Sequence, residues 1–142
     1  MTGLDERNMG LELGAEYEFV SGLKASVVAA LGENVYDSRP TSTITLDNSR
    51  AVLSNRTVYL KNYYVGGSPQ TALSAGLDYL TYCFMYFGVY LNYFDRNYLP
   101  INPDRRTAEA VAGIDPGYPT YDMILDQERL PSAITLDANV GK

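Results

Sequence analysis

Several residue types are absent or scarce in this chain of 142 residues, and each absence removes a class of function. There is no histidine, the commonest general base and metal ligand in proteins. The single cysteine, Cys83, leaves no partner for an internal disulfide or a cysteine-based metal site. We therefore expect no enzymatic activity, no cofactor and no metal site, and we interpret Cys83 as an incidental thiol.

Long apolar runs and basic clusters are missing as well. No stretch approaches the roughly 20 apolar residues that a transmembrane helix needs, and Met1–Arg7 lacks the apolar segment of a signal peptide. The net charge is −6 and no Lys/Arg cluster occurs, so we expect no nucleic-acid partner. The aromatic residues are 13 Tyr and 4 Phe without Trp, and tyrosines suit surfaces that are half buried or lie at a membrane interface.

Alternation of apolar and polar residues with a period of two is the strongest signal that is present. From Leu11 to Phe19 the odd positions are apolar, while the even positions are Glu or Gly. Such a pattern is typical of a strand with one apolar face. Repeated along the chain, it predicts five long strands at about 8–20, 23–36, 69–80, 84–98 and 132–142.

The connections between these strands alternate in length. Short turns at about 21–22 and 81–83 are followed by long loops at about 37–68 and 99–131. Within the first loop, Thr43–Leu46 and Val58–Leu60 favour strands and suggest a short hairpin. Within the second loop, Thr107–Ala112 suggests a helical turn. The two turns therefore lie at one end of the predicted sheet and the two loops at the other.

Strand length and loop asymmetry together indicate the fold class. A strand of roughly 12 residues is about 40 Å long and, tilted by about 45°, spans about 28 Å, near the ~25 Å apolar band of outer-membrane barrels. Those barrels also have short turns on one side and long loops on the other. We therefore predict an all-β antiparallel meander of about five long strands, an open fragment of a transmembrane β-barrel. Glu12, Glu16, Glu18 and Asp78 are expected to line its wet lumen rather than to form a catalytic carboxylate pair.

Three segments resemble a known family, and with the flanking segments the likeness covers nearly the whole chain. They are Asn62–Thr71 with its Tyr-Tyr-Val-Gly-Gly run, Asn92–Asp95 with Asn-Tyr-Phe-Asp, and Ile101–Thr107 with Asn-Pro-Asp-Arg-Arg. The chain resembles the late, C-terminal barrel of Bacteroidetes-type TonB-dependent receptors.

The resemblance implies a 22-stranded barrel in the bacterial outer membrane, of which this chain is a fragment. The expected function is that of a segment of the barrel wall of a TonB-dependent transporter for active nutrient uptake, not competent alone. Its partners would be the rest of the barrel and its plug domain, outer-membrane lipid, the TonB system through the missing N-terminal part, and a surface lipoprotein.

Two further expectations concern ligands and an alternative class. Side chains on the long loops that could contact an extracellular ligand are Tyr59, Tyr63, Tyr64, Asp104, Arg105 and Arg106, although covering strand surface or pairing charges is the commoner role of such residues. The alternative to the transporter is a soluble or surface all-β binding module without membrane contact, which would hide the same apolar face by packing sheet on sheet.

Overall fold

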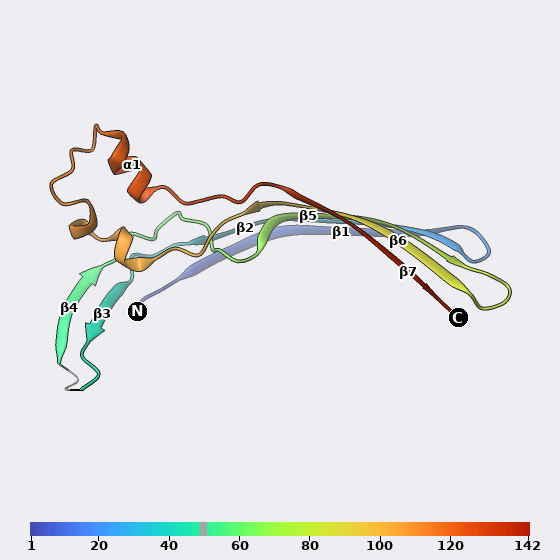
Figure 1. Ribbon diagram of the computed structural model, residues 1–142, viewed down its shortest axis with the longest axis horizontal. Coiled ribbons are helices and arrows are strands. Elements are labelled where there is room, and N and C mark those ends of the chain that lie inside the picture. The colour runs from blue at the N-terminus through green and yellow to red at the C-terminus, as the bar shows by residue number, and fades with distance from the viewer. Residues whose placement is uncertain (49–50) are drawn as a thin grey trace. The chain divides into compact units, whose positions relative to one another are not determined.

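A computed structural model describes residues 1–48 and 51–142, and it is an antiparallel all-β structure with three short helices (Figure 1). The chain divides into two compact units. The first, which we call the sheet unit, comprises Met9–Glu33, Ser68–Asn97 and Arg129–Lys142. The second, which we call the loop unit, comprises Met1–Asn8, Asn34–Gly67 and Tyr98–Glu128.

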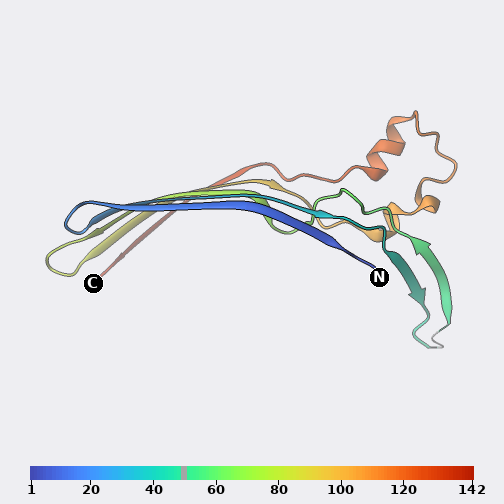
Figure 2. The same ribbon diagram turned by 180° about the vertical axis from the view of Figure 1, so that it is seen from behind.

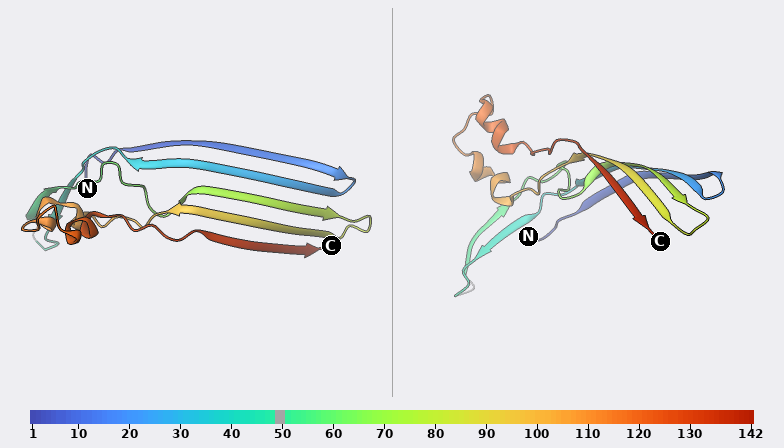
Figure 3. Two further views of the ribbon diagram at one scale, coloured as in Figure 1. Left: turned by 90° about the horizontal axis from the view of Figure 1, so that it is seen from above. Right: turned by 45° about the vertical axis from the view of Figure 1, so that its right-hand side comes forward.

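The predicted antiparallel meander is present as a five-stranded sheet in the order β1-β2-β5-β6-β7 (Figure 3, left). Its strands are β1 (Glu6–Val20), β2 (Leu23–Tyr36), β5 (Pro69–Leu80), β6 (Tyr86–Asn97) and β7 (Ala133–Gly141). The strands alternate apolar residues with residues that are mostly polar or small, with exceptions such as Val28 and Phe94. β1 and β7 form the two edges, so the sheet is open.

A continuous register links the middle and last strands. β2 pairs with β5 from Leu23↔Tyr79 to Leu31↔Thr71, and β6 pairs with β7 from Tyr86↔Gly141 to Phe94↔Ala133. Between them, β5 and β6 pair over their whole length. Such a register fixes which side chains share a face, because a slip of one residue would move every side chain to the other side.

Different local interactions stabilise the two short turns. Gly22 ends the first turn with a φ of +84°, where a side chain would be strained and would also collide with the carbonyl of Leu80. The second turn was expected at 81–83 but extends to Met85. Phe84 adopts a left-handed φ of +61°, and the Thr81 hydroxyl bonds both the N–H and the carbonyl of Met85. β6 therefore begins at Tyr86 rather than at 84.

The first long loop contains a hairpin of its own, formed by β3 (Thr41–Thr45) and β4 (Val52–Thr57) (Figure 2). Our sequence analysis placed its second arm at Val58–Leu60, which was wrong. Val58 and Leu60 are 0% and 2% exposed and belong to the interior of the loop unit. Their apolar character reflects this burial and not a place in the hairpin.

The second long loop carries the three short helices. They are η1 (Pro103–Arg106), η2 (Ala108–Val111) and α1 (Pro119–Leu125), of which only the turn near η2 was predicted. Proline at the first position suits the start of η1 and of α1, because its missing N–H would be unpaired there anyway. Among the described residues, none of these helices has the length and hydrophobicity to span a bilayer.

Candidate functional site

The sheet unit has two faces of opposite chemistry. One face is apolar in every strand for which the register is given: Ala25 pairs with Leu77, Leu77 with Val89, and Val89 with Ala138. Most large side chains on this face are exposed, for example 39% for Leu73 and 70% for Leu136. So large an exposed apolar surface is unusual for a soluble monomer and marks a contact surface.

The opposite face is polar, and its side chains are hydrogen-bonded in a row across three strands. Ser74 donates to the Asn92 amide oxygen at 2.7 Å. The Asn92 amide nitrogen donates to Asp137 at 2.8 Å and to Thr135 at 3.2 Å. Nearer the turns, Lys24 of β2 pairs with Glu16 of β1 at 3.0 Å, which places the β1 carboxylates on this polar face. These groups form an ordered surface that remains compatible with water.

All glycines inside the five strands lie on this polar face. They are Gly10, Gly14, Gly32, Gly76, Gly88 and Gly141. Two of them face tyrosines directly across the sheet, Gly76 opposite Tyr90 and Gly141 opposite Tyr86. Each ring lies so close over its glycine that a side chain there would collide with it. The two tyrosine rings therefore lie flat against the sheet and project little from its polar face.

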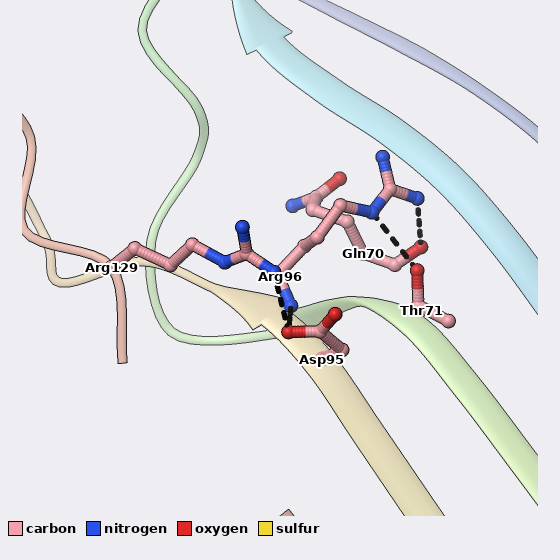
Figure 4. Close-up of polar contacts among 5 residues, drawn as sticks. All are labelled: Gln70, Thr71, Asp95, Arg96 and Arg129. Carbon is pink, nitrogen blue, oxygen red and sulfur yellow. Dashed lines mark hydrogen bonds and ion pairs between the residues drawn. The ribbon is translucent and has the colours of Figure 1, made fainter. Parts of the chain in front are cut away.

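A cluster around Arg96 joins three strands at the loop end of the sheet (Figure 4). Arg96 adopts a left-handed φ of +52°, which is unusual for a residue other than glycine. Its guanidinium donates to Thr71 Oγ1 at 2.9 Å, to the Gln70 carbonyl at 3.1 Å and to the Gly32 carbonyl at 3.0 Å. One side chain of β6 thus holds β5 and β2 together at the end of their paired stretch, which finishes at Leu31↔Thr71.

Asp95 supports this cluster from the same strand. Its carboxylate accepts the Arg96 N–H at 2.7 Å and an ion pair from Arg129 at 2.7 Å (Figure 4). Arg129 leads into β7, so the pair ties the start of the last strand to the end of β6. The carboxylate is 22% exposed while the arginine is 50% exposed, so solvent weakens the pair and we assign it a positioning role.

In the loop unit, Arg106 is the central polar contact between the two long loops. It is 6% exposed, donates to the carbonyls of Ile124 and Asp126, and lies 5.1 Å above the Tyr63 ring. The Tyr63 hydroxyl donates to the Leu125 carbonyl at 2.5 Å. The Arg106 guanidinium and the Tyr63 hydroxyl together therefore bond three consecutive carbonyls, those of residues 124–126 at the end of α1.

Gln127 adds a second link between the same loops. Its amide accepts the Tyr64 N–H at 2.8 Å and donates to the Tyr64 carbonyl at 2.7 Å, which imitates a strand pairing with a single side chain. The Tyr64 ring stacks on Tyr98 with centroids 4.3 Å apart and planes 8° apart. Segment 34–67 and segment 98–128 are thus joined by these side chains and by single backbone bonds such as that from the Tyr59 N–H to the Arg106 carbonyl, and not by a sheet.

Each unit has a cavity that is lined by residues of that unit alone. In the loop unit, a cavity of about 420 Å³ lies between segment 99–102, η1 and residues 123–128. In the sheet unit, a cavity of about 500 Å³ lies beside the two short turns, with Glu18, Lys24 and Asp78 among its lining residues. Both volumes fall in the ~300–1,000 Å³ range of small-ligand pockets. No group of three or more metal-ligating side chains occurs in the described part of the chain.

Cys83 is exposed in the turn between β5 and β6. Its sulfur lies 3.3 Å from Thr81 Oγ1, and this hydrogen bond lowers the pKa of the Cys83 thiol below its usual value. The thiolate is the reactive form of cysteine. The lowered pKa of Cys83 therefore favours its thiolate form at a given pH.

The six residues predicted to contact a ligand all lie in the loop unit but differ in exposure. Arg106 is buried, Tyr63 and Tyr64 are half-buried, and all three make the contacts between loops described above. Tyr59 is 40% exposed and lies 5.4 Å from the Arg39 guanidinium. Asp104 and Arg105 are exposed on η1, and Arg105 lines the loop cavity. Ligand contact remains a prediction for these residues.

The contacts of Arg96 and Gln127 were not predicted from the sequence. Arg96 stands in an alternating strand, and nothing in its neighbourhood signals a left-handed backbone. Gln127 lies in a loop without periodicity, and its partner Tyr64 is distant in sequence. Neither residue had a local signal that could have revealed its contacts.

No protein-family model matches this chain, and neither a curated protein nor a solved structure matches it.

Proposed function

We propose that this chain is part of the barrel wall of an outer-membrane TonB-dependent transporter for active nutrient uptake. Its role is non-enzymatic: it separates lipid from a wet lumen and completes its function only with the rest of the barrel and a plug domain. The TonB system and a surface lipoprotein are further proposed partners. The observation that carries the proposal is the exposed apolar face that stays in register from β2 to β7 and is backed by a hydrogen-bonded polar face.

The extent of the apolar face supports this role. On β1 it runs from Leu11 to Phe19, about 30 Å of extended chain at ~3.3 Å per residue. Tilted by ~40°, this stretch has a height of about 23 Å, close to the ~25 Å apolar band of outer-membrane barrels. Because no backbone group can remain unpaired in hydrocarbon, the open edges of β1 and β7 require further strands.

The order of side chains along the apolar face supports the same role. Near the short turns the face is aromatic, with Tyr17, Phe19, Tyr79 and Phe87. Farther from the turns it is mainly aliphatic, with residues such as Val27 and Leu91, and Tyr93 lies beyond them toward the long loops. Aromatic residues favour the border between hydrocarbon and headgroups, so this gradient fits a membrane surface with the turns at one border.

A pair of tryptophan variants tests the proposal by comparing the two faces of β6 at nearly the same depth in the membrane. The chain has no tryptophan, so Leu91→Trp and Asn92→Trp each give a single reporter, and these neighbours lie on opposite faces of β6. We expect lipids brominated on their acyl chains to quench Trp at 91 strongly in reconstituted vesicles, and Trp at 92 far less. Equal quenching at both positions, or no quenching at 91, would contradict the membrane role.

Behaviour in plain buffer provides a second test. With its apolar face and two strand edges uncovered, the chain is expected to aggregate without detergent and to become monodisperse with it. A compact monomer with cooperative melting in detergent-free buffer would favour a soluble all-β binding module instead.

A further inference from the structure

The cavity of the loop unit combines apolar walls with charges of both signs. Its apolar lining comes from Leu99, Ile101 and Met123, and Met123 is 78% exposed although it is a large apolar side chain. Arg105 and Arg106 contribute cations from η1. A second, smaller concavity shares Arg105, Met123 and Ile124 with it, so the recess continues past α1.

The cationic part of this lining has unused capacity for an acceptor. Arg106 is 6% exposed, yet its partners are neutral carbonyls and the Tyr63 ring, and its Nε is buried without a hydrogen-bond partner among the described residues. Exposed Arg105 makes no ion pair within residues 1–48 and 51–142. A carboxylate entering the cavity would pair directly with exposed Arg105, and the positive charge of buried Arg106 would add attraction at longer range.

The other charged residues of the lining are acidic. Asp126 and Glu128 follow α1, and the side chain of exposed Glu128 has no ion pair in the described part of the chain. Two cations and two carboxylates cancel in net charge. A simple anion would be repelled by the acidic side and a metal cation by the arginines, whereas a ligand that carries both charges matches each side.

We propose that this cavity binds a short peptide that has a free carboxylate, a free ammonium group and an apolar side chain. The carboxylate lies at Arg105 with Arg106 beneath it, the ammonium group lies at Glu128 and Asp126, and the side chain packs on Leu99 and Met123. A volume of about 420 Å³ is within the usual range for a ligand of this size. The inference uses the loop unit alone and does not depend on the transporter role.

Blocking the ends of the ligand tests the assignment on the unaltered protein. The full chain in detergent micelles is titrated calorimetrically with Ala-Leu-Ala, with its N-acetyl form and with its C-terminal amide. Loss of one charge-assisted contact is expected to weaken binding about tenfold or more for each blocked peptide. No binding of the free peptide at millimolar concentration, or equal binding of all three, would overturn the proposal.

Substitutions then assign each ligand end to its partner. Arg105→Gln should reduce the preference for the free acid over the amide, and Glu128→Gln should reduce the preference for the free amine over the acetylated peptide, because Arg106 and Asp126 remain in the lining. Arg39→Gln is the matched control, because it removes the same charge from the loop unit outside the cavity lining. Either preference unchanged by its own substitution would also overturn the proposal. Aggregation in plain buffer bears only on the transporter role, so the two failures are distinguishable.

Discussion

The ring of Tyr90 lies directly over Gly76, its cross-strand partner in the β5–β6 register. A Cβ added to Gly76 would lie 2.6 Å from Tyr90 Cδ1 and 2.7 Å from Ser26 Oγ. The hydroxyl of the same ring donates to Asp78, two residues farther along β5. Glycine, tyrosine and aspartate thus form one arrangement, in which the absence of a side chain allows a ring to lie flat and reach a carboxylate.

Gly76→Ala should destabilise the sheet. Either the Tyr90 ring rotates away and loses Asp78, or the strands shift, and such overpacking costs about 1–3 kcal/mol. Chemical unfolding in detergent micelles, followed by far-UV circular dichroism, measures the change. Gly14→Ala on β1 is the control, because a Cβ there meets no atom within 4 Å and the glycine lies on the same polar face. A Gly76→Ala variant as stable as Gly14→Ala would show that the ring is not held in this position.

The sequence predicted the sheet unit better than the loop unit. The meander followed from the alternation itself, because a period of two assigns each strand residue to a face before any partner is known. The contacts of the loop unit did not follow, since Arg106 meets carbonyls about 20 residues away across segments without periodicity. The helix α1 had one overlooked signal, Pro119 at its first position.

The strand boundaries near the second turn illustrate a subtler limit. Alternation continues through Cys83 and Met85, so the pattern alone placed the start of the strand at 84. The Thr81 hydroxyl bonds both backbone groups of Met85 and so extends the turn to that residue. Within this longer turn, Phe84 adopts a left-handed conformation. Side-chain-to-backbone bonds of this kind compete with strand pairing and are invisible to periodicity.

The left-handed backbone of Arg96 predicts an order of stability for two variants. Both Arg96→Ala and Arg96→Gly lose the bonds to Thr71, Gln70 and Gly32. Alanine also retains the cost of a left-handed conformation, about 1–2 kcal/mol, which glycine avoids. Arg96→Gly should therefore be the more stable variant by about 1 kcal/mol in the unfolding assay described for Gly76. The reverse order would mean that β6 relaxes to an extended conformation once the arginine is gone.

The Thr81–Cys83 contact predicts the pH at which the thiol reacts. Because the hydrogen bond between Thr81 and Cys83 lowers the pKa of the Cys83 thiol, the thiolate is present at a lower pH than in an unstructured peptide. The rate of alkylation by iodoacetamide should accordingly rise at lower pH in the folded chain. Thr81→Val should raise the pKa and move the profile to higher pH, while Thr45→Val, on the β3 strand, should leave it unchanged. Cys83 is the only cysteine, so the reaction reports on this site alone.

The contacts of Tyr63 that join the two long loops can be removed one at a time. Tyr63→Phe deletes the bond to the Leu125 carbonyl but keeps the ring beneath Arg106, and should weaken the link between the loops by about 1 kcal/mol. Tyr63→Leu also deletes the cation–π contact and should weaken it further. Hydrogen exchange at the Tyr64 N–H, which bonds Gln127, and at the Tyr59 N–H, which bonds the Arg106 carbonyl, measures the opening.

Tyr118→Phe is the matched control for this series, because that tyrosine is 63% exposed in the same unit. Exchange at both amides should accelerate from the control to Tyr63→Phe and again to Tyr63→Leu. Acceleration at Tyr64 without any at Tyr59 would mean that Arg106 holds its loop independently of the ring, so the two links act separately. Unchanged exchange in Tyr63→Leu would show that Tyr63 contributes nothing to holding the loops together, and that the Gln127 pairing and the backbone bonds between the loops suffice.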